Sequence, residues 1–209
     1  MTPSEFLEAV RTDNETALSR LGSSKALYAD TGGELDAEHV LRAAADAELV
    51  AMETFEAWAQ EEPNEDARET FDTTADEERA HTQAITAELD DYDPDETPSA
   101  MHAHLRELET TVERAGGLLG RTLAAEQSKQ QLVGFFVGQA DPQTADVFRD
   151  LKADVDDQRD RTLDLLDALC DTDDAWNRAK TAADDTIQAA YDDYVEQLQA
   201  QGVDPKPVC

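Results

Sequence analysis

The chain has 209 residues, which is long enough for one sizeable domain with its own hydrophobic core. It carries 49 acidic residues against 17 basic ones, which gives a net charge of −32. Binding to nucleic acid or to an anionic membrane surface needs a basic patch, so this charge argues against both as partners. The sequence has neither a run of about 20 apolar residues nor a recognisable signal peptide, and we therefore expect a cytoplasmic protein without a membrane span.

Taken in order, the chain has helical periodicity throughout and divides into three parts. Residues 1–34 hold an amphipathic helix over residues 3–20, followed by a loop rich in glycine and serine. Residues 35–171 hold the long helical segments, and residues 172–209 hold a further helix and an irregular tail. We therefore predict an all-α fold.

Four long helical segments make up the central part. They are predicted over about residues 36–62, 65–91, 99–140 and 141–170, and the last additional helix over about residues 175–201. A proline-containing linker separates the second segment from the third. Three glycines in the third segment are expected to bend or loosen it: Gly116, Gly117 and Gly120.

Charged residues interrupt the apolar stripes of three of these helices. Glu78 and His81 stand three residues apart on the apolar face of the second segment, Glu48 lies near the centre of the apolar face of the first, and Glu126 lies within the stripe of the third. Burying a charge costs several kcal/mol unless the charge is paired or binds a metal. Carboxylates and imidazoles suit iron or manganese, so these residues predict a metal site.

The fourth segment can be aligned in two ways. If the two halves of the chain are a loose repeat, Asp156 and Arg159 take the positions of ligands. The apolar phase instead turns Gln158 and Thr162 inward, and turns Asp156, Asp157 and Asp160 outward. We adopt the phase because it rests on five apolar positions.

These residues resemble the ferritin-like superfamily, including the rubrerythrins, over roughly residues 36–170. The resemblance implies a four-helix bundle with Glu on the first helix, Glu-x-x-His on the second, Glu on the third and a second Glu-x-x-His on the fourth. The fourth helix here has no His, and its Gln looks more like heavy-type ferritin subunits. The implied function is ferroxidase or peroxidase activity in iron and oxidative-stress handling. The ligands of two iron or manganese ions would be Glu48, Glu78, His81, Glu126 and Gln158.

Composition adds expectations about surroundings and partners. Only five of the basic residues are Lys, and this Asp-rich, Lys-poor balance resembles cytosolic proteins of salt-accumulating archaea, where salt screens the repulsion. The two cysteines, Cys170 and Cys209, form no Cys-x-x-Cys pair, so the chain cannot build a rubredoxin-type iron site. Peroxidase turnover would therefore need an external electron donor. We also expect a homo-oligomer, in the simplest case a dimer.

The alternative interpretation is a metal-free bundle of the same fold that acts as a scaffold or regulatory interaction protein. Lys129 or Arg159 would then replace the metal by pairing with the glutamates, and His81 would be a hydrogen-bonded core residue. His102 and His104 lie on a segment that looks exposed, and we interpret them as surface residues.

Overall fold

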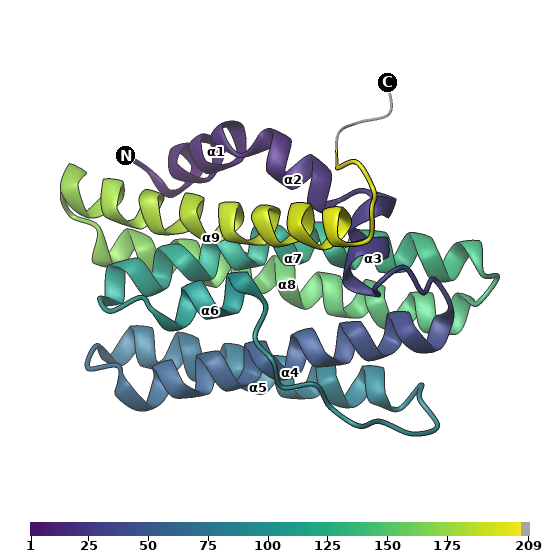
Figure 1. Ribbon diagram of the computed structural model, residues 1–209. Coiled ribbons are helices and arrows are strands. Elements are labelled where there is room, and N and C mark those ends of the chain that lie inside the picture. The colour runs from purple at the N-terminus through teal and green to yellow at the C-terminus, as the bar shows by residue number, and fades with distance from the viewer. Residues whose placement is uncertain (206–209) are drawn as a thin grey trace.

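The computed structural model describes residues 1–205, and every regular element within them is a helix (Figure 1). This confirms the all-α prediction. The helices are α1 (Pro3–Asp13), α2 (Glu15–Leu21), α3 (Ser24–Asp30), α4 (Ala37–Glu61), α5 (Glu65–Thr86), α6 (Ala100–Arg106), α7 (Thr111–Gly138), α8 (Pro142–Leu169) and α9 (Asp173–Ala200).

Capping residues set where the long helices begin. The side chains of Asp36, Asn64 and Asp141 each accept a hydrogen bond from a backbone N–H in the first turn of α4, α5 and α8. Pro142 follows the last of these caps at the first helical position, where its missing N–H costs nothing. Such caps satisfy donors that would otherwise have no partner, so neighbouring helices can be joined by short turns.

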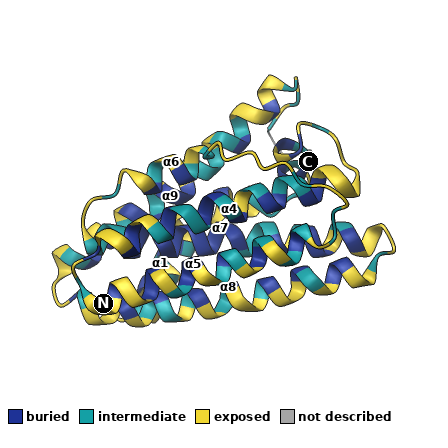
Figure 2. Ribbon diagram, turned by 90° about the horizontal axis from the view of Figure 1, so that it is seen from below, coloured by how far each residue is buried: buried dark blue, intermediate teal, exposed yellow. Residues whose placement is uncertain are grey.

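The long helices form a bundle in which α7 is central. Helix α4 packs against α5, and α7 packs against both α8 and α9, while α5 and α8 join the two groups. Helices α1 and α2 lie on the outer side of α9, α3 lies near the end of α9 and also contacts α7 and α4, and the connection from α5 to α6 crosses the molecule beside α4 (Figure 1). Buried residues line the inner faces and exposed residues the outer faces, as Figure 2 shows for α8.

Helix α7 is unusual because it is buried on all sides over three turns. Every residue from Ala115 to Ala125 is buried, and the glycines in this stretch lie against α9. A Cβ atom at Gly116 would lie 2.2 Å from the carbonyl oxygen of Ala179, so only glycine permits this close approach. Helix α7 is continuous through these glycines, and Gly116 and Gly120 bring it close to α9.

Three stretches differ from the sequence predictions. The helix expected over residues 3–20 is divided at Asn14 into α1 and α2. Residues 24–30, expected in a loop, form α3 because Ala26, Leu27 and Ala29 are buried, and this helix packs mainly on α9. The segment expected as one helix over residues 99–140 is broken into α6 and α7. Thr110 and Glu113 form a capping box that starts α7 afresh.

None of the helices in the described residues is long and apolar enough to cross a membrane. Cys170 is buried at the end of α8, whereas Cys209 lies outside the described residues.

Candidate functional site

Three of the predicted site residues meet between α4 and α5. Glu48, Glu78 and His81 are 1%, 0% and 2% exposed, and each offers a ligand atom within 4.8 Å of the others. Residues three apart on a helix share a face, which is why Glu78 and His81 point to the same partner on α4. This buried group could hold a metal ion.

Arg121 of α7 binds the carboxylate of Glu78 from the opposite side. Its two terminal nitrogens each donate to one oxygen of Glu78 at 2.7 Å, which is the bidentate arrangement that makes such pairs strong. The Gln158 amide completes the contact: its nitrogen donates to Glu78 at 2.8 Å, and its oxygen accepts from Arg121 at 3.1 Å. Both oxygens of Glu78 therefore already have strong donors.

Lys129, one turn beyond the centre of α7, donates from Nζ to one oxygen of Glu48. The other oxygen of Glu48 lies 3.6 Å from Arg121 and 3.4 Å from Nδ1 of His81. Burial alone would raise the pKa of Glu48, but Lys129 above all, with help from His81 and Arg121, holds this pKa well below its ordinary value. Glu48 is therefore ionised despite being buried.

His81 lies between three carboxylates. Its Nδ1 faces Glu48 at 3.4 Å and Glu78 at 3.6 Å, and its Nε2 faces Asp154 at 3.1 Å. Burial lowers the pKa of His81, but the hydrogen bonds and charges of the two glutamates outweigh burial and raise this pKa to about 10. The imidazole is therefore a cation at neutral pH.

We call these residues the ionic cluster: Glu48, Glu78, His81, Arg121, Lys129 and Asp154. Its two buried glutamates lie among three buried cationic groups, and the third carboxylate, that of Asp154, is 52% exposed and completes the charge balance from the solvent side. A buried group of charges is tolerated only when it is paired in this way.

The cluster does not fit a di-metal centre. Metal binding requires free carboxylate oxygens and a neutral imidazole. Here donors from Arg121, Lys129 and Gln158 engage the glutamates, and both ring nitrogens of His81 face carboxylate oxygens. A dication placed among them would also be repelled by the guanidinium and the ammonium group.

Glu126 lies apart from this cluster. Its side chain is 21% exposed, and its carboxylate lies 3.2 Å from Arg11 and 4.0 Å from Arg159. The predicted ligand of a second metal is therefore engaged in ion pairs near the surface, and Arg159 pairs there and not with Glu48 or Glu78.

The helical phase adopted for α8 is confirmed. Gln158 and Thr162 are both 0% exposed, whereas Asp157 and Asp160 face solvent and Asp156 is half-buried. The competing alignment, which put Asp156 and Arg159 at the centre, is wrong. Gln158 does reach Glu78, but as a hydrogen-bond donor to it.

Sequence reasoning missed Arg121 and Asp154. Arg121 is the only charged residue between Ala115 and Ala125. A charge inside such an apolar run must be buried and paired, so this pattern could have identified Arg121 as the partner of a buried carboxylate. His102 is a further correction: it is 3% exposed, because it lies on the one face of the short α6 that packs against α9 and α4.

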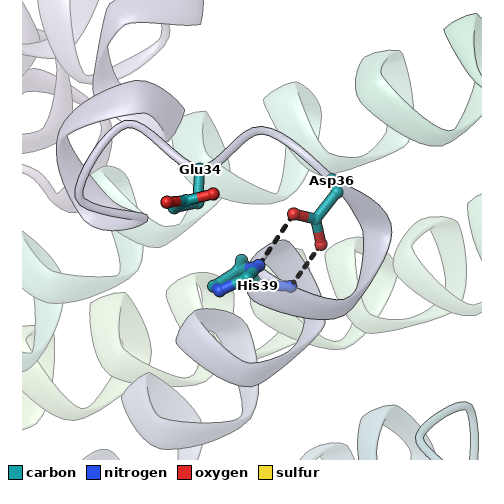
Figure 3. Close-up of side chains that lie close together, drawn as sticks. All are labelled: Glu34, Asp36 and His39. Carbon is teal, nitrogen blue, oxygen red and sulfur yellow. Dashed lines mark hydrogen bonds and ion pairs between the residues drawn. The ribbon is translucent and has the colours of Figure 1, made fainter.

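A second group of potential ligands is exposed at the start of α4. Glu34, Asp36 and His39 lie close together there, as Figure 3 shows. Asp36 accepts from the backbone N–H of His39 at 3.1 Å, and its other oxygen lies 2.7 Å from Nδ1 of the same residue. These contacts are those of a helix cap, which explains the group without a ligand.

The chain matches no protein-family model, no curated protein and no solved structure at a significant level, so the functional argument rests on the geometry of the site.

Proposed function

We propose that this chain is a metal-free helical bundle related to the ferritin-like proteins, in which the ionic cluster takes the place of a di-metal centre. In this proposal the protein is not an oxidoreductase. It acts as a scaffold or regulatory interaction protein whose interior is held together by ion pairs.

The observation that supports this proposal is the pairing of both buried glutamates with cations on α7. Arg121 binds Glu78 through two hydrogen bonds, and Lys129 binds Glu48. The positive charges that two metal ions would bring are thus supplied by the chain itself. Removing one partner of such a pair is strongly unfavourable, so a metal ion would have to displace both cations to bind.

A second candidate is the ferroxidase or peroxidase that the resemblance implies. One observation favours it: ligand atoms of Glu48, Glu78 and His81 lie within 4.8 Å of one another. For this activity Arg121 and Lys129 would have to leave the carboxylates, and Glu126 would have to turn away from Arg11.

Metal titration separates the two candidates. The protein, purified in molar potassium chloride, is loaded with ferrous iron or Mn²⁺ without oxygen, desalted, and its metal content measured. We expect the wild type to retain no stoichiometric metal. We expect Arg121→Gln combined with Lys129→Gln to bind metal, because both carboxylates are freed.

Two controls make the result readable. Arg159→Gln removes a cation outside the ionic cluster and should leave the wild-type result unchanged. If the double variant fails to fold, Lys129→Gln alone replaces it, and we expect it to bind more metal than the wild type because the carboxylate of Glu48 is freed. Stoichiometric metal in the wild type that is lost in Glu78→Ala would overturn the proposal and establish the second candidate.

A further inference from the structure

A cavity of about 610 Å³ lies between α4 and α7 and is bordered by α3, α6 and α9. It exists because the side chains facing each other across these two helices are small: Ala43, Ala44 and Ala47 on α4, and Ala124 and Ala125 on α7. Its volume falls within the range of about 300–1,000 Å³ that is usual for small-molecule sites.

Two buried polar atoms on residues that line this cavity have no hydrogen-bond partner. They are Nε2 of His102 and the hydroxyl of Tyr194, and both side chains belong to residues only 3% exposed. The other ring nitrogen of His102 lies 3.0 Å from the Ser99 hydroxyl. Because buried polar groups are nearly always paired, the two atoms call for a partner that the described chain itself does not supply.

The charge that remains in the cavity wall is negative. Arg121 and Lys129 line the cavity, but both are engaged by the glutamates of the ionic cluster. Asp30, whose side chain is exposed to solvent, and the partly buried Asp193 line it as well, and the carboxylate of Asp30 has neither a hydrogen bond nor an ion pair in the part of the chain that the structure describes. Enclosure by its neighbours above all, together with repulsion from Asp193, raises the pKa of Asp30, and the solvent exposure of its side chain weakens this effect.

We propose that this cavity binds a small organic amine with a short apolar body. The ammonium group pairs with Asp30 and Asp193, and the apolar body lies along the alanine wall. The hydroxyl of Tyr194 and the imidazole of His102 then satisfy polar groups of the same ligand. This inference goes beyond the proposed function and does not depend on it, because Asp30, Asp193, His102 and Tyr194 are not part of the ionic cluster.

The test compares three probes of one shape and different charge: hexylamine, hexan-1-ol and hexanoate. Binding to the whole protein is measured by calorimetry in molar potassium chloride, where the Debye length of about 3 Å suppresses general attraction to the acidic surface. We expect hexylamine to saturate at one molecule per chain. Hexan-1-ol should bind at least about tenfold more weakly, since it lacks the charge-assisted contact, and hexanoate should not bind.

Three variants locate the site. Asp30→Asn should weaken hexylamine about tenfold and leave hexan-1-ol unchanged. Asp192→Asn is the matched control, because Asp192 is exposed on α9 and does not line the cavity, and it should change neither affinity. Ala47→Phe fills the cavity from a position already exposed within it, and should abolish binding of both probes while the protein stays folded.

Equal affinities for hexylamine and hexan-1-ol would overturn the proposal. So would an equal loss of hexylamine affinity in Asp30→Asn and Asp192→Asn, or binding that survives in folded Ala47→Phe. None of these outcomes affects the metal titration, so failure of this inference and failure of the proposed function are distinguishable.

Discussion

Arg121 is the residue on which the ionic cluster depends most. It contacts both Glu78 and Glu48, and its guanidinium lies 5.7 Å from the ring centre of Phe55. Replacing it leaves a carboxylate buried without its cation, which is far more costly than losing an exposed ion pair.

We expect Arg121→Met to lower the free energy of unfolding by about 3–5 kcal/mol. Arg149→Met on α8, which breaks an exposed pair with Asp146, should cost less than about 1 kcal/mol. Urea unfolding at constant molar salt measures both. A comparable cost for the two variants would mean that the ionic cluster does not hold the fold together. In the double variant Arg121→Met with Glu78→Met, most of the loss should be recovered, because no unpaired charge remains.

Asp30 gives a pH-dependent prediction with a definite sign. Enclosure by its neighbours and repulsion from Asp193 raise its pKa above the ordinary 3.8, by an amount that the solvent exposure of its side chain reduces, so the folded state binds more protons above about pH 4. The contribution of Asp30 to stability therefore falls as pH rises from about 4. Asp30→Asn removes the titrating group, and it should raise the melting temperature more at about pH 8.5 than at about pH 5.

The control for this measurement is Asp192→Asn, an exposed position on α9. Its effect on the melting temperature should be the same at both pH values. A parallel response of the two variants would show that general surface charge, and not the surroundings of Asp30, sets the pH dependence.

At the scale of the helices, glycines on α7 allow its backbone to approach the backbone of α9 closely. A Cβ at Gly116 would lie 2.2 Å from a carbonyl oxygen of α9, whereas a Cβ at Gly134 would meet nothing within 4 Å. Gly116→Ala should therefore destabilise the protein by about 1–3 kcal/mol, because backbone must move. Gly134→Ala should stabilise it by about 0.5–1 kcal/mol through helix propensity alone.

Thermal or urea unfolding of these two variants compares the same substitution in one helix. If both stabilise the protein, α7 and α9 are not in backbone contact. If both destabilise it, the effect of alanine on α7 is not explained by the neighbour of each glycine.

Periodicity predicted the long helices well because each of α4, α5 and α8 buries one face. It placed Glu48, Glu78 and His81 together, and it oriented Gln158 correctly. It was less informative for α7, where residues are buried on every side and no stripe indicates which of them faces α4. The pairing of Arg121 and Lys129 with the glutamates, and the position of Glu126 near the surface, depend on how α7 packs. The spacing of residues in the sequence therefore could not predict them.

At the scale of the whole molecule, the net charge of −32 determines how the protein responds to salt. Exposed carboxylates repel one another over a Debye length of about 30 Å at 0.01 M salt, but of only about 3 Å at 1 M. We expect the melting temperature to rise steadily over this range. Scans in potassium and sodium chloride should agree, and a melting temperature independent of salt would contradict the screening argument.

The position of α9 against α7 has a consequence for synthesis on the ribosome. Residues 173–200 cover the glycine face of α7, yet they are translated about 60 residues after it. Until they emerge, the helix that is buried on every side in the folded protein has no partner on one side, and such uncovered surface is prone to aggregation. The interior of the nascent chain therefore cannot close before α9 has been translated, which makes the docking of α9 on α7 the step that commits this protein to its fold.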